Sequence, residues 1–144
     1  MATRGAFRLT IPEPNELDIH LACVNALERI LLPPVQFTTF EAGHFKLSAA
    51  QAARQTRLKV ATGWPDILLV WRGIWGIEIK SSGGTLSKTV VRYDRRGRPR
   101  IVIGQEDRFQ LLRAAGFRDI AVVTSITDLI RVLATWNIPR REVL

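Results

Sequence analysis

Two carboxylates and one amine occur in this chain at a spacing that suits metal-assisted hydrolysis. Glu78 lies twelve residues after Asp66 and is followed at once by Ile79 and Lys80. Mg²⁺ prefers hard oxygen ligands and keeps several of its waters, so one or two carboxylates suffice to hold it. The backbone carbonyl of Ile79 could supply another oxygen, and Lys80 could orient a water or offset charge on a phosphate. These residue types point to hydrolysis of a phosphodiester bond.

The side chains can meet only if the two strands predicted at 66–71 and 74–80 pair in a suitable register. Directly opposed residues of an antiparallel pair point to the same face. A register that opposes Asp66 to Lys80 and Ile67 to Ile79 gathers the apolar residues on one face, and a slip by one residue would break that face. The apolar face would hold Ile67, Leu69, Trp71, Trp75, Ile77 and Ile79. We therefore expect Asp66, Glu78 and Lys80 to share the other face.

The same residues belong to a longer series of motifs. The series consists of Glu16-Leu17-Asp18-Ile19-His20, Gly63-Trp64-Pro65-Asp66-Ile67, Ile77-Glu78-Ile79-Lys80-Ser81, Leu86-Ser87, Gln105 and Leu112-x-x-Ala115-Gly116-Phe117. This series resembles the VRR-NUC family of the PD-(D/E)XK nuclease superfamily over about residues 15–138. One departure is His20, where the family usually has glutamine.

The resemblance implies a restriction-endonuclease-like αβββαβ core and an endonuclease that uses Mg²⁺ or Mn²⁺. It implies that Asp66 and Glu78 bind the metal and that Lys80 is catalytic. By the same resemblance Glu16 is a further acidic site residue and metal ligand, and Gln105 helps to orient the water or Lys80. The family includes stand-alone phage and bacterial proteins, some of which cut branched DNA such as Holliday junctions as homodimers.

Each of these residues also has a purely structural interpretation. Asp66 could be a turn residue after proline, and Glu78 and Lys80 could form a weak ion pair on a solvated strand face. Glu16 in a first helical turn favours the helix dipole without any site. Gln105 could be only a polar residue at a helix start.

The charge of the chain predicts a polyanionic partner. The 144 residues include 21 basic and 13 acidic side chains, giving a net charge of +8. Because neutralised phosphates release counterions, such a surplus favours nucleic acid, and no long basic amphipathic helix is present to favour a membrane surface. The residues predicted to contact nucleic acid are Lys88, Arg92, Arg95, Arg96, Arg98, Arg100, His44 and Arg54. The arginine-rich segment could instead be a solvated hairpin tip, and it is longer than the connection usual in the family.

The remaining elements predict one α/β domain over 1–144 with a mixed sheet and an added basic β-hairpin. Helices are predicted from a cap at Asn15 to about residue 31, from a cap at Ser48 to about residue 60, from Gln105 to Ala115 before a left-handed Gly116, and from a cap at Ser125 to about residue 136. Strands are predicted at 35–40, 90–93, 100–103 and 119–124.

These features favour a DNA endonuclease of phage or bacterial type in the cytoplasm. We see no signal peptide and no apolar stretch long enough to cross a membrane. The single cysteine, Cys23, falls on an apolar helical stripe and is expected to be a buried, reduced thiol. A catalytically silent nucleic-acid-binding subunit and an RNA-directed nuclease are the alternatives. A homodimer is compatible with symmetric cutting of a junction, and the hairpin at 90–103 is a candidate dimer face.

Overall fold

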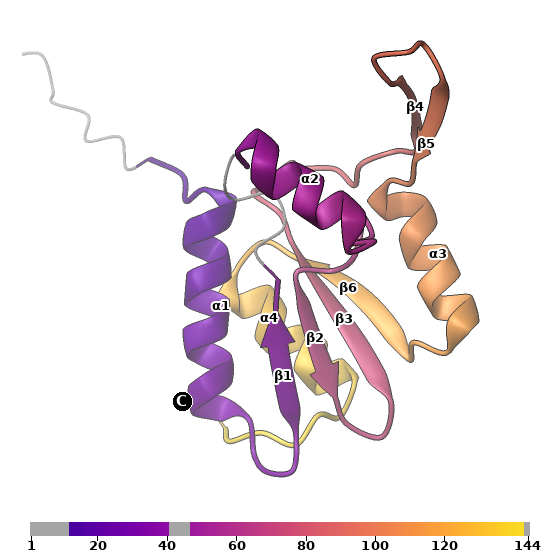
Figure 1. Ribbon diagram of the computed structural model, residues 1–144. Helices are drawn as coiled ribbons and strands as arrows, with labels where there is room; N and C mark the ends of the chain where they lie inside the picture. The colour runs from indigo at the N-terminus through magenta and orange to yellow at the C-terminus, as the bar shows by residue number, and fades with distance from the viewer. Residues whose placement is uncertain (1–11, 41–46, 143–144) are drawn as a thin grey trace, which may run out of the picture.

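The structure is a computed structural model that describes residues 12–40 and 47–142. In these ranges the chain forms four helices, a four-stranded mixed sheet and a two-stranded hairpin (Figure 1), which confirms the predicted mixed α/β class. The elements in chain order are α1 (Glu16–Ile30), β1 (Gln36–Thr39), α2 (Ala49–Arg57), β2 (Ile67–Val70), β3 (Ile74–Ile79), β4 (Val90–Tyr93), β5 (Pro99–Val102), α3 (Gln105–Ala115), β6 (Asp119–Val123) and α4 (Ile126–Thr135).

Local sequence signals begin and end most of these helices. The side chains of Asn15, Ser48 and Ser125 each accept a hydrogen bond from the backbone N–H three residues further on, as predicted. Gly116, with φ 119°, caps the end of α3 in the left-handed conformation. Helix α2 ends three residues earlier than predicted, because Lys59 takes a left-handed φ of 58°.

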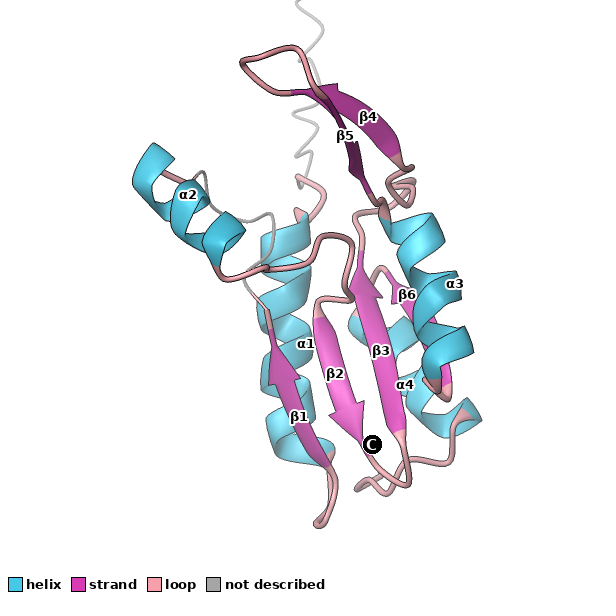
Figure 2. Ribbon diagram, turned by 45° about the vertical axis from the view of Figure 1, so that its right-hand side comes forward, coloured by secondary structure: helices cyan, strands magenta, loops and turns pink. Residues whose placement is uncertain are grey.

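The main sheet has the strand order β1-β2-β3-β6. Strands β1, β2 and β3 pair antiparallel, and β6 returns parallel to β3 after the chain has passed through α3. Helices α1 and α4 cover one face of the sheet, and α3 lies on the other face beside β6 (Figure 2). The sheet is therefore enclosed by helices on both sides at its β3–β6 half.

The apolar core lies between the sheet and the α1–α4 pair. Side chains that are wholly buried there include Cys23, Leu27, Ile67, Leu69, Ile77, Ile79, Val123, Leu129 and Leu133. Cys23 is buried, as predicted. This burial, and then the charge of Asp128, raise the pKa of its thiol to about 11. A second, smaller cluster of Phe109, Leu112 and Ile120 packs beneath α3, with Trp64 against it.

The predicted register of β2 and β3 is wrong by two residues. Ile67 pairs with Ile77 rather than with Ile79. The reason is the turn, in which Arg72 and Gly73 have positive φ values and the N–H of Trp71 bonds to the Gly73 carbonyl. Because side chains alternate with a period of two, a shift of two leaves every residue on its predicted face.

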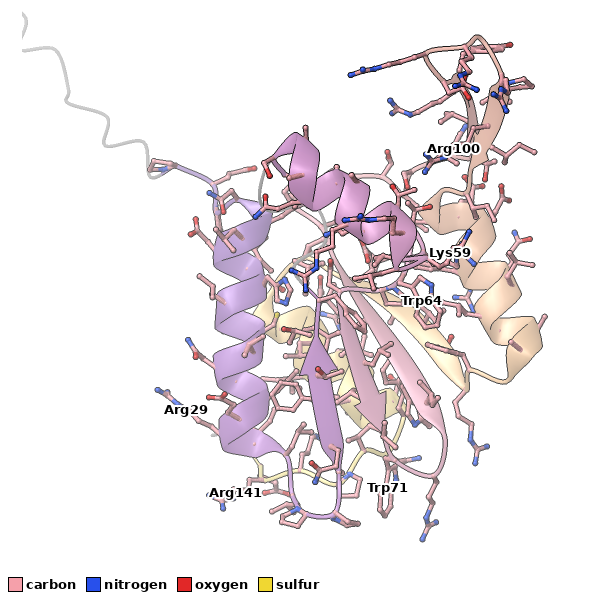
Figure 3. The ribbon with its side chains drawn as sticks, in the orientation of Figure 1. Arg29, Lys59, Trp64, Trp71, Arg100 and Arg141 are labelled. Atoms are coloured by element: carbon pink, nitrogen blue, oxygen red, sulfur yellow. The ribbon has the colours of Figure 1, made fainter. Side chains whose placement is uncertain are left out.

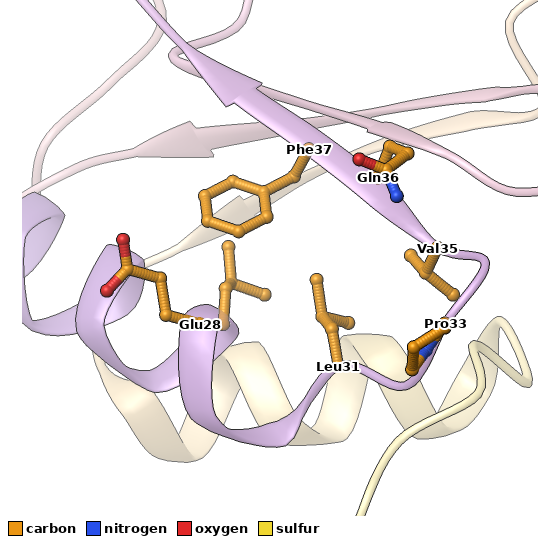
Figure 4. A pocket seen from close by; sticks show the side chains of 7 residues that line it. Glu28, Leu31, Pro33, Val35, Gln36 and Phe37 are labelled. Atoms are coloured by element: carbon orange, nitrogen blue, oxygen red, sulfur yellow. The ribbon is translucent and has the colours of Figure 1, made fainter.

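A pocket of about 300 Å³ lies between the C-terminal end of α1 and the start of β1 (Figure 4). Its lining consists of Leu27, Glu28, Leu31, Pro33, Val35, Gln36 and Phe37. Since Gln36 pairs with Val70, this pocket is at the end of the sheet remote from Asp66. Of the helices in the described ranges, none is both long and apolar enough to span a bilayer.

Gly76 allows Pro65 to pack directly on the central strand. A Cβ atom at residue 76 would come within 2.7 Å of the Pro65 Cγ and 3.2 Å of the Ile120 Cγ1. The lack of a side chain at Gly76 thus fixes the position of Pro65, which directly precedes Asp66 at the start of β2.

We predict that Gly76→Ala destabilises the protein by about 1–3 kcal/mol, because the added methyl overpacks a tight contact. The free energy of unfolding in urea, measured for Gly76→Ala, Pro65→Ala and the double variant, checks this. Pro65→Ala should reduce the cost of the alanine at 76. Strict additivity of the two changes would contradict the proposed contact.

Candidate active site

Three of the predicted residues converge where β2 begins and β3 ends. Asp66 directly precedes β2, Glu78 lies one residue before the end of β3, and Lys80 directly follows it. When the observed register is continued by one pair beyond Ile67 and Ile77, Asp66 lies opposite Glu78, not opposite Lys80 as predicted. Both carboxylates therefore belong to the sheet face opposite the apolar core.

The Asp66 carboxylate is tied to the backbone of the neighbouring strand. It is 6% exposed, and its Oδ2 accepts a hydrogen bond of 2.8 Å from the N–H of Ile79. The N–H and carbonyl of one strand residue point to the same side, so the Ile79 carbonyl also points toward β2. Pro65, which lies opposite Ile79 in the continued register, has no N–H to donate to it. The Ile79 carbonyl is thus oriented suitably for the ligand role predicted from sequence.

The Glu78 carboxylate is the most deeply buried charged group of the site. Its side chain is 2% exposed, and its Oε1 lies 3.3 Å from the Lys80 Nζ and accepts a hydrogen bond from the Gln105 Nε2. Its Oε2 is buried, and no group of the described residues donates a hydrogen bond to it. A buried carboxylate oxygen without a donor is costly. A cation bound at that oxygen would remove the cost, so the residues present fit a divalent metal.

The electrostatics of Glu78 lead to the same conclusion. Burial, and then the negative charge of Asp66, raise the pKa of Glu78 from 4.5 to about 8, although Lys80 and Gln105 act in the opposite direction. The single ammonium group beside the two carboxylates leaves a net negative charge. A proton or a metal ion can compensate that charge, and the two compete for the same oxygens.

Gln105 is oriented by the loop segment 86–88, which runs beside the start of α3. Its Oε1 accepts a hydrogen bond of 3.1 Å from the N–H of Ser87, which leaves its Nε2 to donate to Glu78. The Ser87 Oγ in turn accepts from the Gln105 N–H at 2.9 Å. A Cβ atom on Gly104 would collide with the backbone of Lys88, so the close passage requires glycine. Sequence reasoning missed the positioning roles of Ser87 and Gly104, for which the Leu86-Ser87 motif is the only signal.

The predicted acidic residue Glu16 is not grouped with the other two carboxylates. It is the first residue of α1 and is partly exposed. Within the described ranges, no three His, Cys, Asp or Glu side chains come together closely enough to hold a metal ion. His20, one helical turn further on, is buried. Asp66 and Glu78 are therefore the acidic pair that the structure brings together, and the site role of Glu16 stays a prediction.

Most of the predicted nucleic-acid contacts lie on two exposed projections near this end of the sheet, and Lys88 is exposed two residues before β4. The hairpin formed by β4 and β5 carries the arginines from 92 to 100, and α2, which has no buried residue, carries Arg54. A groove of about 620 Å³ has both α2 and the hairpin in its lining, including Lys59 and Arg100, which Figure 3 labels. His44 falls outside the described residues.

No family model, curated protein or solved structure that was compared with the chain matches it. The VRR-NUC resemblance therefore rests on the motif residues themselves. Of these, Asp66, Glu78, Lys80 and Gln105 form one group, in which the two acids are buried and Lys80 and Gln105 are partly exposed. This group offers hard oxygen atoms for a divalent cation and an ammonium group for an anionic substrate.

We predict that Glu78 makes the metal-free protein less stable as the pH rises. The folded protein holds a proton on Glu78 up to a pKa of about 8, whereas the unfolded chain loses it near 4.5. The stabilising contribution is thus fully present below pH 4.5 and is lost as the pH rises to about 8, amounting to a few kcal/mol.

The measurement is urea unfolding in EDTA from pH 5 to pH 9. Glu78→Gln should remove this pH dependence and exceed the parent in stability at pH 8. The exposed Glu28→Gln serves as the matched control and should behave like the parent. Equal pH dependence in parent and Glu78→Gln would refute the assigned burial of a titrating carboxyl group.

Proposed function

We propose that this protein is a Mg²⁺- or Mn²⁺-dependent endonuclease of the VRR-NUC type that hydrolyses phosphodiester bonds of DNA. The observation that carries the proposal is the Glu78 carboxylate, which is buried with one oxygen that no group of the described residues donates to. Beside it lie a second carboxylate and an ammonium group, from Asp66 and Lys80. A structural ion pair needs neither the second acid nor the uncompensated oxygen.

Asp66, Glu78 and the Ile79 carbonyl would hold the metal. When bound, the metal polarises a phosphoryl oxygen and lowers the pKa of a water that can attack phosphorus. The contact from the Ile79 N–H fixes the Asp66 carboxylate, and Gln105 fixes one oxygen of Glu78. Both acids are therefore oriented before any ligand arrives, which reduces the reorganisation that binding requires.

Lys80 is placed to act on the substrate rather than only on Glu78. Its side chain is 12% exposed, whereas that of Glu78 is 2% exposed, so the ammonium group lies nearer to solvent. An ammonium group at this position can offset the charge that develops on the phosphate in the transition state. We assign that role to Lys80.

The order of the elements supports the finer fold assignment. Elements α1, β1, β2, β3, α3 and β6 follow one another in the order αβββαβ, with β6 parallel to β3. Helix α2 and the β4–β5 hairpin are insertions into that order. The resemblance adds branched DNA as a substrate and a homodimer as an assembly, which we include in the proposal.

The net charge of +8 supports nucleic acid as the substrate. Six of the 21 basic residues and only one of the 13 acidic residues fall between 88 and 104. The basic residues are therefore concentrated on the hairpin, whereas the group of Asp66, Glu78, Lys80 and Gln105, which we call the catalytic group, holds two acids. Phosphate contacts of this kind would position the DNA without selecting a sequence.

We predict that Asp66→Asn, Glu78→Gln and Lys80→Met each lower the cleavage rate at least about a hundredfold, because each removes a group that acts in the transition state. Purified protein is incubated with labelled linear, flapped and four-way DNA, with Mg²⁺ or with EDTA. Circular dichroism and DNA binding should remain at the level of the parent.

The control for the loss of a positive charge is Arg29→Met. Arg29 is exposed in the last turn of α1, away from the catalytic group and from the hairpin (Figure 3). This variant should cleave DNA at the rate of the parent. A loss in Lys80→Met that Arg29→Met does not share is then specific to the site rather than to the net charge.

Three outcomes of this panel would contradict the proposal. Full Mg²⁺-dependent cleavage by Lys80→Met would refute the assigned role of the lysine. Binding without any cleavage would favour a catalytically silent subunit. Cleavage of RNA in preference to every DNA substrate would favour an RNA-directed nuclease.

We further predict that Mg²⁺ stabilises the protein through Glu78. At a Mg²⁺ concentration about ten times its Kd, the stabilisation amounts to about 1.4 kcal/mol, because the ion binds only the folded state. Differential scanning calorimetry at pH 8 should show a higher Tm with Mg²⁺ for the parent and no shift for Glu78→Gln. An equal shift in both proteins would place the bound ion elsewhere.

A further inference from the structure

The β4–β5 hairpin has two chemically different faces. Its register pairs Val91 with Ile101 and Arg92 with Arg100. Since side chains alternate along a strand, the apolar pair and the arginine pair lie on opposite faces. The pair at the turn, Tyr93 with Pro99, falls on the face of Val91. One face of the hairpin is therefore apolar with a single aromatic ring, and the other carries two guanidinium groups together with the Val90–Val102 pair at the base of the hairpin.

The apolar face is open to solvent. The exposed fractions are 71% for Tyr93, 69% for Ile101 and 53% for Val91. Neither of the two apolar clusters in the described part of the chain includes any of the three. A two-stranded hairpin gains little stability by itself, and these three exposed side chains are available to contact a partner.

The charge of the hairpin identifies the chemistry of the partner. Its only acidic residue, Asp94, is used within the turn, where Oδ1 accepts the backbone N–H groups of Arg96 and Arg98. The Arg98 Nε lies 3.9 Å from the Asp94 Oδ2, and the other arginines of the hairpin, Arg92, Arg95, Arg96 and Arg100, form a cationic surface. Single-stranded nucleic acid presents phosphates and unstacked bases together, and proteins bind it by combining basic groups with aromatic stacking. A continuous duplex offers the phosphates but keeps its base faces covered.

Both ends of the hairpin are anchored beside the candidate active site. The Thr89 Oγ1 accepts a hydrogen bond of 3.1 Å from the Gly104 N–H and donates one to Asp107. Two residues before Thr89, Ser87 is bonded to Gln105, whose amide contacts Glu78. A strand bound along the hairpin would thus lie next to the catalytic group.

We propose that the β4–β5 hairpin is a binding site for single-stranded DNA, with Tyr93 and Ile101 contacting unstacked bases and Arg92 and Arg100 contacting phosphates. The proposal rests on the proposed nuclease function and names its substrate class. The nuclease acts on DNA that contains an unpaired segment next to the bond that is cut.

Equilibrium binding in EDTA tests the proposal without any cleavage. The probes are a fluorescein-labelled continuous duplex and the same duplex with a short single-stranded gap, both measured by fluorescence anisotropy with the full chain. We expect the parent to bind the gapped DNA about tenfold more tightly. The double variant Tyr93→Ser/Ile101→Ser should lose that preference, while its affinity for the duplex stays within about twofold of that of the parent. Tyr93→Phe should retain it, because phenylalanine also stacks.

The arginine face is tested separately. Arg92→Gln combined with Arg100→Gln should weaken binding of both probes by a similar factor and reduce the dependence of log Kd on log salt concentration. Thermal unfolding should be unchanged in all these variants, since the altered side chains lie outside both apolar clusters. Fluorescence of 2-aminopurine placed in the gap should be quenched by the parent and by Tyr93→Phe, but not by the serine variant.

Equal affinity of the parent for the two probes would overturn the proposal. So would a loss of oligomeric state in the serine variant, measured by light scattering, with the preference for gapped DNA intact, because the apolar face would then bind protein. The nuclease proposal can fail while the binding site holds. In that case no protein cleaves DNA with Mg²⁺, but the parent still prefers gapped DNA and the serine variant does not.

Discussion

The carboxylate of Glu78 lies in the interior at the end of the central strand, where an uncompensated charge is unfavourable. Three separate elements supply groups that compensate it or share its environment. Lys80 directly follows the same strand, Asp66 directly precedes the neighbouring strand β2, and Gln105 is the first residue of α3. Yet one oxygen has no donor among the described residues. The fold thus maintains a negatively charged cluster that is completed by a proton or a cation.

Close backbone approach is what brings these elements together. Pro65 packs on Gly76, and the chain around Ser87 passes directly over Gly104. In each case an added Cβ atom would displace backbone or a rigid ring. Gly76 lets Pro65 pack closely and so sets the position of Asp66. Gly104 lets the chain at Ser87 pass closely and so sets the position of Gln105. Residues without functional groups therefore determine the geometry of those that carry the chemistry.

Local signals made most of the fold and part of the site predictable from the sequence. Caps such as Asn15 and the left-handed Gly116 act within a few residues, so their effect can be read from the chain. The alternation of apolar residues determined the face of Asp66 but not its partner, because a register shift of two residues preserves the faces. The end of α2 before the left-handed Lys59 and the contact between Ser87 and Gln105 depend on backbone conformation and tertiary packing, which carry no local pattern.

In the proposed nuclease, the distribution of charge separates DNA binding from hydrolysis. In the metal-free protein below a pH of about 8, protonated Glu78 leaves one carboxylate and one ammonium group, so the proposed catalytic group has no net positive charge with which to attract DNA. In our proposal the arginines of the hairpin supply that attraction from a position outside the catalytic group, and salt should screen their contribution. Because Gln105 is bonded both to Glu78 and to Ser87 at the base of the hairpin, the two functions share one anchor. A substrate bound as we propose would therefore be held in a fixed relation to the carboxylates, which is the requirement for positioning a phosphodiester at a metal site.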